Sequence, residues 1–170
     1  MIDNSERLAT SDERAVALAC IESATEAAAP ETATRSAVAV DGETLTVADS
    51  AYDLGEYDEV VVVGGGKAAG GVARTLESVL GDRLTGGLIV TKHPVETERV
   101  RAATGDHPLP SERNVDATAD LIETVRGADE RTLVLFVLTG GASALLSAPA
   151  GSLTLADLQE TTQALLEGGV

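Results

Sequence analysis

The chain has 170 residues and carries 28 acidic against 12 basic side chains, so its formal net charge is −16. This length supports one domain with a real hydrophobic core and excludes two large domains. Such an acidic surface repels phosphate backbones, which argues against general nucleic-acid binding. The acidic residues are scattered, so a solvated coat suited to high salt explains them better than an acidic interaction surface. The amino-acid composition, with scarce Lys and abundant Asp, Glu, Ala and Thr, resembles that of halophilic proteins.

Aromatic residues are only 2% of the chain and Trp is absent, so the core must consist of Ala, Val and Leu. Cys20 lies in the apolar stretch 15–21, which predicts a helix whose Cys20 side chain is buried against neighbouring elements. No Cys/His cluster has the spacing of metal ligands. The N-terminus lacks the pattern of a signal peptide, and no apolar run approaches the roughly 18 to 20 residues that span a bilayer. We therefore expect a soluble, cytoplasmic protein without membrane contacts.

The first part of the chain predicts a helix followed by a hairpin. Ser11 precedes acidic residues typical of a helix start, and this helix should end before Pro30. Residues 36–40 and 44–47 flank the turn pair Asp41-Gly42, which favours a β-hairpin.

The rest of the chain alternates strands and helices. Apolar runs at 58–63 and 87–91 predict buried strands of a parallel sheet, and 132–138 predicts a third strand. The segment 92–110 should be irregular with room for a short strand. A helix over 67–80 should end at Gly81, and a last helix opens at Thr154. The helix that Ser111 caps should run to about Arg126, and its spacing predicts an inward face of Val115, Ala119, Ile122 and Val125.

This alternation predicts the α/β class: a three-layer α/β/α domain with a doubly wound, mostly parallel, Rossmann-like sheet and a small N-terminal hairpin. Ligands bind such sheets at the carboxyl ends of the strands. The abrupt end of the chain also predicts an open sheet whose remaining strands lie elsewhere.

The only two lysines, Lys67 and Lys92, follow predicted strands at that edge. Lys67 comes after Gly64, Gly65 and Gly66, but a Walker A loop would need glycine at Val61 and Ser or Thr at Ala68. The same stretch matches the permissive dinucleotide pattern, Gly-x-Gly-x-x-Ala. An acid for the ribose hydroxyls is missing after the next strand, which disfavours NAD.

Phosphate binding is the other use of this turn. Glycines let backbone N–H groups approach an anion, and Lys67 adds a full charge that would stabilise a transferred phosphoryl group. The alternative is a tight structural turn with a lysine that reaches to solvent.

A second glycine turn, Gly140-Gly141-Ala142-Ser143, follows the strand at 132–138. Gly-x-Ser-x-Gly is absent, so Ser143 is predicted to bind phosphate or a substrate hydroxyl, or to cap a helix, rather than to act as a nucleophile. His107 is a substrate contact or a structural residue of a constrained loop. Lys92 either adds positive charge beside the site or belongs to an ordinary surface.

Four segments carry a family resemblance in order and spacing: 61–69, 86–92, 106–112 and 138–147. Together they resemble the N-terminal domain of the class-II, MOFRL-type glycerate kinases, a family also labelled glycerate 2-kinase or hydroxypyruvate reductase. The resemblance spans residues 5–170. Lys67 matches the family's active-site lysine, and the turn at 140–143 matches its second glycine turn. His107-Pro108 matches a Gly-His-Pro segment in which Asp106 replaces the glycine.

The resemblance implies ATP-dependent phosphorylation of D-glycerate to 2-phosphoglycerate with Mg²⁺, at a site between two domains. It implies that residues 1–170 form the N-terminal α/β domain, without the C-terminal domain that carries a catalytic arginine, and that this fragment has little activity alone. Its partner would be the missing domain or a second copy. The alternatives are an NAD(P)H-dependent hydroxypyruvate reductase and a non-catalytic domain that binds a nucleotide or complements a partner.

Overall fold

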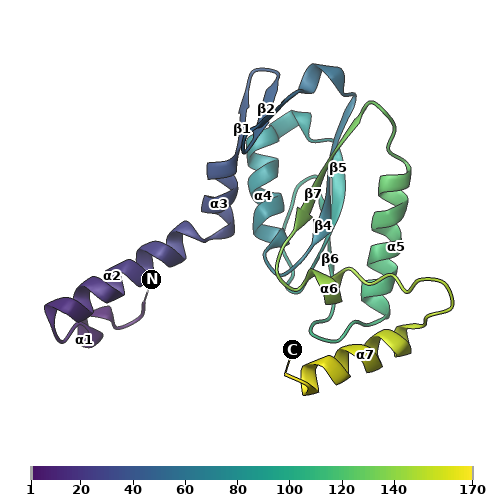
Figure 1. Ribbon diagram of the computed structural model, residues 1–170. Helices are drawn as coiled ribbons and strands as arrows, with labels where there is room; N and C mark the ends of the chain where they lie inside the picture. The colour runs from purple at the N-terminus through teal and green to yellow at the C-terminus, as the bar shows by residue number, and fades with distance from the viewer. Residues whose placement is uncertain (1, 170) are drawn as a thin grey trace.

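The computed structural model describes residues 2–169 and begins with three helices: α1 (Ser5–Leu8), α2 (Asp12–Ala27) and α3 (Pro30–Ala37). The predicted helix start is confirmed, since the Ser11 side chain accepts a hydrogen bond from the N–H of Arg14. Pro30 does more than end a helix, because it opens α3 at a position where its missing N–H costs nothing. Helices α1 and α2 project away from the body (Figure 1). The predicted burial of Cys20 is wrong, since its side chain is exposed on α2.

A small antiparallel sheet follows, with strand order β1-β2-β3. The predicted hairpin is confirmed as β1 (Val38–Asp41) and β2 (Thr44–Val47), although α3 occupies the first two residues assigned to it. A third strand, β3 (Ser50–Asp53), pairs with β2 and was not predicted. Its side chains are exposed, so it lacks the alternation of apolar and polar residues that marks a half-buried strand.

The central sheet is parallel and has the order β6-β5-β4-β7. Its strands are β4 (Glu59–Gly65), β5 (Gly86–Thr91), β6 (Arg101–Thr104) and β7 (Thr132–Leu138). The positions and the parallel pairing of these strands match the predictions, including the short strand within 92–110. From β4 the chain moves through β5 to β6 on one side, and it then returns to place β7 on the other side of β4.

Helices cover both faces of this sheet, which confirms the predicted three-layer α/β architecture (Figure 1). Along β4, Val60 and Val62 pack with Ala73 and Leu76 of α4 (Ala69–Leu80) in one core cluster. Val63 points to the other face and packs with Leu121 of α5 (Glu112–Arg126). The same strand therefore buries successive side chains in two separate layers, as a central parallel strand must.

The predicted inward face of α5 is wrong. The buried residues are Asn114, Ala117, Thr118 and Leu121, whereas Ala119 and Val125 are exposed. Apolar spacing misplaced the face because two of the buried side chains are polar and satisfied by hydrogen bonds. Burial of a polar group is tolerated when its partners are present, and hydrophobic periodicity does not register such cases.

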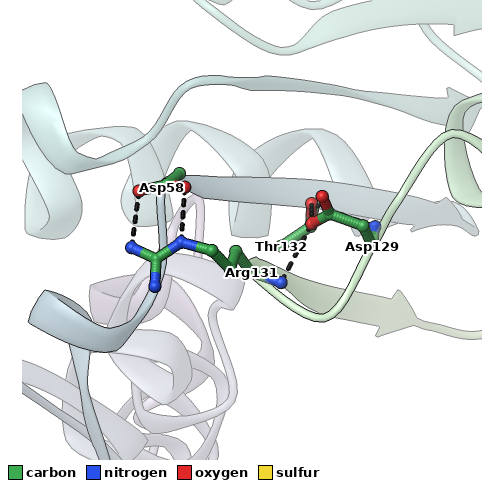
Figure 2. Close-up of polar contacts among 4 residues, drawn as sticks. All are labelled: Asp58, Asp129, Arg131 and Thr132. Atoms are coloured by element: carbon green, nitrogen blue, oxygen red, sulfur yellow. Dashed lines mark hydrogen bonds and ion pairs between the residues drawn. The ribbon is translucent and has the colours of Figure 1, made fainter.

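At the amino edge of the sheet, an ion pair joins the starts of the two strands β4 and β7. Arg131 donates from Nη2 to the carboxylate of Asp58 at 2.6 Å, and its backbone N–H donates to Asp129 at 2.9 Å (Figure 2). The guanidinium lowers the pKa of the Asp58 carboxyl below its usual range. Both side chains are exposed, so we expect this pair to add little stability.

The last elements are α6 (Ala142–Leu145) and α7 (Leu155–Glu167), the latter capped by Thr154 and Asp157 as predicted. Two short 3₁₀ turns lie at Leu54–Glu56 and Gly81–Arg83.

Strand β7 ends the sheet on its side, and there Phe136 is 57% exposed and Leu138 67% exposed. Within residues 2–169, none of the helices has the length and apolar content needed to cross a bilayer.

Candidate anion site

Four loops gather at the carboxyl edge of the parallel sheet, because each follows the end of one of its strands. The loop after β4 carries Lys67, the loop after β5 carries Lys92, the loop after β6 carries His107, and the turn after β7 leads to Ser143. The chain reverses its winding direction between β4 and β7. That switch point is where open α/β sheets bind ligands, and both glycine turns lie beside it.

The first glycine turn, Gly64–Gly66, includes the last two residues of β4 and is packed tightly against its neighbours. A Cβ added to Gly64 would lie 1.9 Å from the carbonyl oxygen of Val137, and one added to Gly66 would lie 2.6 Å from that of Thr139. The N–H of Gly66 donates to the Val90 carbonyl at 3.0 Å. All three glycines are buried, so this turn gives close backbone packing and offers no open cradle for an anion.

Hydrogen bonds tie the first turn to the second. The backbone N–H of Lys67 donates to the Gly140 carbonyl at 2.9 Å, and the N–H of Ala68 donates to the hydroxyl of Thr139 at 3.2 Å. In the other direction, the N–H of Thr139 donates to the Gly65 carbonyl at 3.1 Å. These bonds fix the backbone of Lys67. Its side chain is exposed, so its ammonium group stays available to a ligand.

The second turn leaves donors free. Among the residues that the structure describes, the backbone N–H groups of Gly140, Gly141 and Ser143 have no hydrogen-bond acceptor. Gly140 and Ser143 are exposed, and Gly141 and Ser143 both line a shallow hollow beside the end of β7. Free N–H groups in a turn of this kind favour an anion.

Lys67 and His107 converge on Gly141. The position of a Cβ on Gly141 would be 2.9 Å from Cε of Lys67 and 3.0 Å from Nε2 of His107. Partial burial and the charges of Lys67 and Lys92 lower the pKa of His107 below its usual value. Lys92 is therefore close enough to add to the positive electrostatic field that His107 experiences.

Two residues that support this arrangement were missed by sequence reasoning. Thr139 accepts the hydrogen bond from Ala68, and Asn114 of α5 bonds to the loop that carries His107. Ser111 and Asn114 have the spacing of a capping box, which was a signal for the helix start. That signal predicts a local cap only, and the long-range contacts of Asn114 depend on the fold.

The donor set fits a phosphate or carboxylate group. Lys67, Lys92 and the three free N–H groups all favour negative charge. It does not fit a metal ion by itself, since no group of three or more His, Cys, Asp or Glu side chains in residues 2–169 could hold one. These residues alone therefore support no catalytic step through Mg²⁺.

Several known proteins are similar to this chain in sequence, and a solved structure is similar to it in fold. A glycerate 2-kinase from Pyrococcus horikoshii is 31% identical over 160 residues, which are 93% of this chain and 36% of that protein. A putative hydroxypyruvate reductase from Agrobacterium vitis is 38% identical over 111 residues, 64% of this chain and 29% of the relative. A crystal structure of a protein from P. horikoshii OT3 matches with a TM-score of 0.81 and 30% identity, and it covers all of this chain and 37% of that one.

The chain thus spans about a third of the length of the curated relatives it matches. Residues 16–170 match the family described as "Domain of unknown function (DUF4147)". The resemblance noted in the sequence is confirmed: the chain belongs to the DUF4147 family, the N-terminal domain of the MOFRL-type glycerate 2-kinases.

Proposed function

We propose that residues 1–170 are the N-terminal domain of a glycerate 2-kinase and provide its phosphate-binding half. In this reaction ATP supplies the phosphoryl group, D-glycerate accepts it, and 2-phosphoglycerate and ADP are formed. The observation that carries the proposal is the set of free N–H groups at Gly140, Gly141 and Ser143 beside the Lys67 side chain. A relative named glycerate 2-kinase, similar over nearly the whole chain, supports the choice of reaction.

Lys67 would stabilise the negative charge that spreads over the transferred phosphoryl oxygens. Its backbone is already bonded to the second turn, so the charge is positioned before the ligand arrives and costs little reorganisation. Lys92 and His107 would hold the carboxylate or hydroxyl of glycerate. Gly64–Gly66 would act by fixing the backbone of Lys67, since their close packing leaves no room for phosphate.

A second domain would complete the site on the side of β7. Within the described residues 2–169 this strand pairs only with β4. Its exposed Phe136 and Leu138 continue into an apolar groove of about 520 Å³ that α3, β1 and β2 also line. An exposed apolar edge strand favours association, and a covering domain would remove it from water. We propose the C-terminal domain of the longer enzymes as this cover.

The test is glycerate-dependent release of ADP in molar KCl with Mg²⁺. The chain would be assayed alone and after mixing with the C-terminal region of the P. horikoshii relative, and folding would be checked by circular dichroism. We expect little activity alone and activity on mixing that a Lys67→Ala chain does not support. Activity of the chain alone that rises with its own concentration would favour a second copy as partner. Folded protein that neither binds phosphate nor gains activity would contradict the kinase proposal.

Hydroxypyruvate reduction is the second candidate, because a relative carries that name. The residues at the end of β5 argue against it: Thr91 is buried, and Lys92 and His93 are exposed, so no acid stands where a dinucleotide ribose would bind. The same preparation would be tested for oxidation of NADH and NADPH with hydroxypyruvate. We expect no turnover there, and oxidation faster than ADP release would reverse the assignment.

A further inference from the structure

We propose that Asn114 is a positioning residue, which holds the loop of His107 against the second glycine turn and so sets His107 beside Lys67. Its expected effect on phosphate binding rests on the proposed function, whereas its effect on the His107 loop does not. Asn114 lies in the first turn of α5 and is fully buried.

The amide of Asn114 reaches both ends of the loop between β6 and α5. Its Oδ1 accepts from the N–H of Asp106 at 2.9 Å and from the N–H of Ser111 at 3.0 Å. Its Nδ2 donates to the Asp106 carbonyl at 2.9 Å. The loop over residues 106–111 is therefore closed onto one side chain, and His107 follows directly after the anchored Asp106.

The second N–H of the same amide reaches a different element. Nδ2 also donates to the carbonyl of Ala144 in α6, at 2.9 Å. Ala144 follows Ser143, so one buried group connects the His107 loop with the segment that carries the free N–H groups. Only an amide offers two donors and an acceptor in this geometry, and a carboxylate or an apolar side chain of similar size would leave backbone groups unpaired.

A purely structural role is the competing explanation, and Ser147 provides a matched control for it. Its hydroxyl also donates to the Ala144 carbonyl, at 2.8 Å, and it is buried as well. It makes no hydrogen bond to residues 106–111. Ser147→Ala therefore removes a buried bond at the same carbonyl and leaves the His107 loop anchored.

The experiment follows His107 by NMR in a His93→Gln background, so that His107 is the only histidine signal. The pKa of its imidazole would be measured in the parent chain, in Asn114→Ala and in Ser147→Ala, together with binding of inorganic phosphate. We expect the pKa of His107 to rise toward its ordinary value of about 6.5 in Asn114→Ala, since the ring becomes more exposed to water and moves away from the lysines. Phosphate affinity should fall at least about tenfold. Ser147→Ala should lose thermal stability but keep both values.

An unchanged His107 pKa in folded Asn114→Ala, or an equal change in Ser147→Ala, would overturn the proposal. If Asn114→Ala does not fold, Asn114→Asp replaces it: the acceptor and the volume are kept, and the donations to Asp106 and Ala144 are lost. That variant should also shift the His107 signal, and an unshifted signal would overturn the proposal. If phosphate fails to bind the parent chain, the proposed function fails, and the His107 measurement still decides the role of Asn114.

Discussion

The two glycine turns of this domain look alike in sequence and differ in structure. The first turn is closed: its glycines are buried, added methyl groups would meet backbone atoms, and the N–H of Gly66 is bonded to the neighbouring strand. The second turn is open: a Cβ on Gly140 would meet nothing within 4 Å, and three N–H groups lack acceptors among residues 2–169.

This difference separates two uses of glycine. At the first turn, glycine permits close approach of two backbones, and Lys67 is positioned as a result. At the second turn, glycine leaves backbone donors accessible to a ligand. Substitutions at the two turns should therefore affect different quantities: the free energy of unfolding at the first and anion affinity at the second.

The largest effect is expected at Gly66. Its φ of 132° is unfavourable for alanine, and the added methyl would press on the Thr139 backbone. Gly66→Ala should lower the free energy of unfolding by more than about 4 kcal/mol or prevent folding. Urea denaturation followed by circular dichroism measures this, and a loss below about 1 kcal/mol would mean that the turn is not closed in solution.

Gly141→Ala should mainly weaken binding. The φ of 85° costs alanine about 1 kcal/mol of stability, while the methyl displaces the side chains of Lys67 and His107. We expect phosphate affinity to fall at least about tenfold, measured by calorimetry. Affinity equal to that of the parent chain would show that these side chains do not meet at Gly141.

His107→Gln tests the electrostatics of the site through pH. Because the folded pKa of His107 is lowered, the unfolded chain takes up the proton first as pH falls below about 6.5. The parent chain should therefore lose more stability than His107→Gln between pH 7 and pH 5. Melting temperatures of both chains across that range provide the test, and parallel curves would show that the pKa of His107 is not lowered in the folded chain.

The smallest effect is expected at Gly140. Since its Cβ would lie in open space and its φ is not in the left-handed region, Gly140→Ala should change the free energy of unfolding by no more than about 0.5 kcal/mol. Urea denaturation beside Gly66→Ala gives the comparison. A large loss would indicate that the second turn is also packed.

The sequence predicted the sheet and most helices because their signals are local. Strands such as 132–138 are continuous apolar runs, and Thr154 and Asp157 mark a helix start within one turn. The edge position of β7, with Phe136 exposed, follows from strand order and could not be predicted from its apolar run.

The site was predictable only in part. The positions of Lys67 and Lys92 after strands placed both at the carboxyl edge, as the fold confirms. The closed state of the first turn depends on Val137 and Thr139, which lie about seventy residues away along the chain. The role of Asn114 was hidden for the same reason, and because a buried polar side chain breaks the apolar pattern that assigns helix faces.

The most direct measurement of the central claim is a phosphate titration of the ¹⁵N-labelled chain, followed by amide NMR in the parent and in Lys67→Met. We expect the amides of Gly140, Gly141 and Ser143 to shift with one dissociation constant, those of Gly64–Gly66 to stay nearly still, and the binding to weaken at least about tenfold without Lys67. Shifts centred on the first turn, or affinity unaffected by Lys67→Met, would contradict the account.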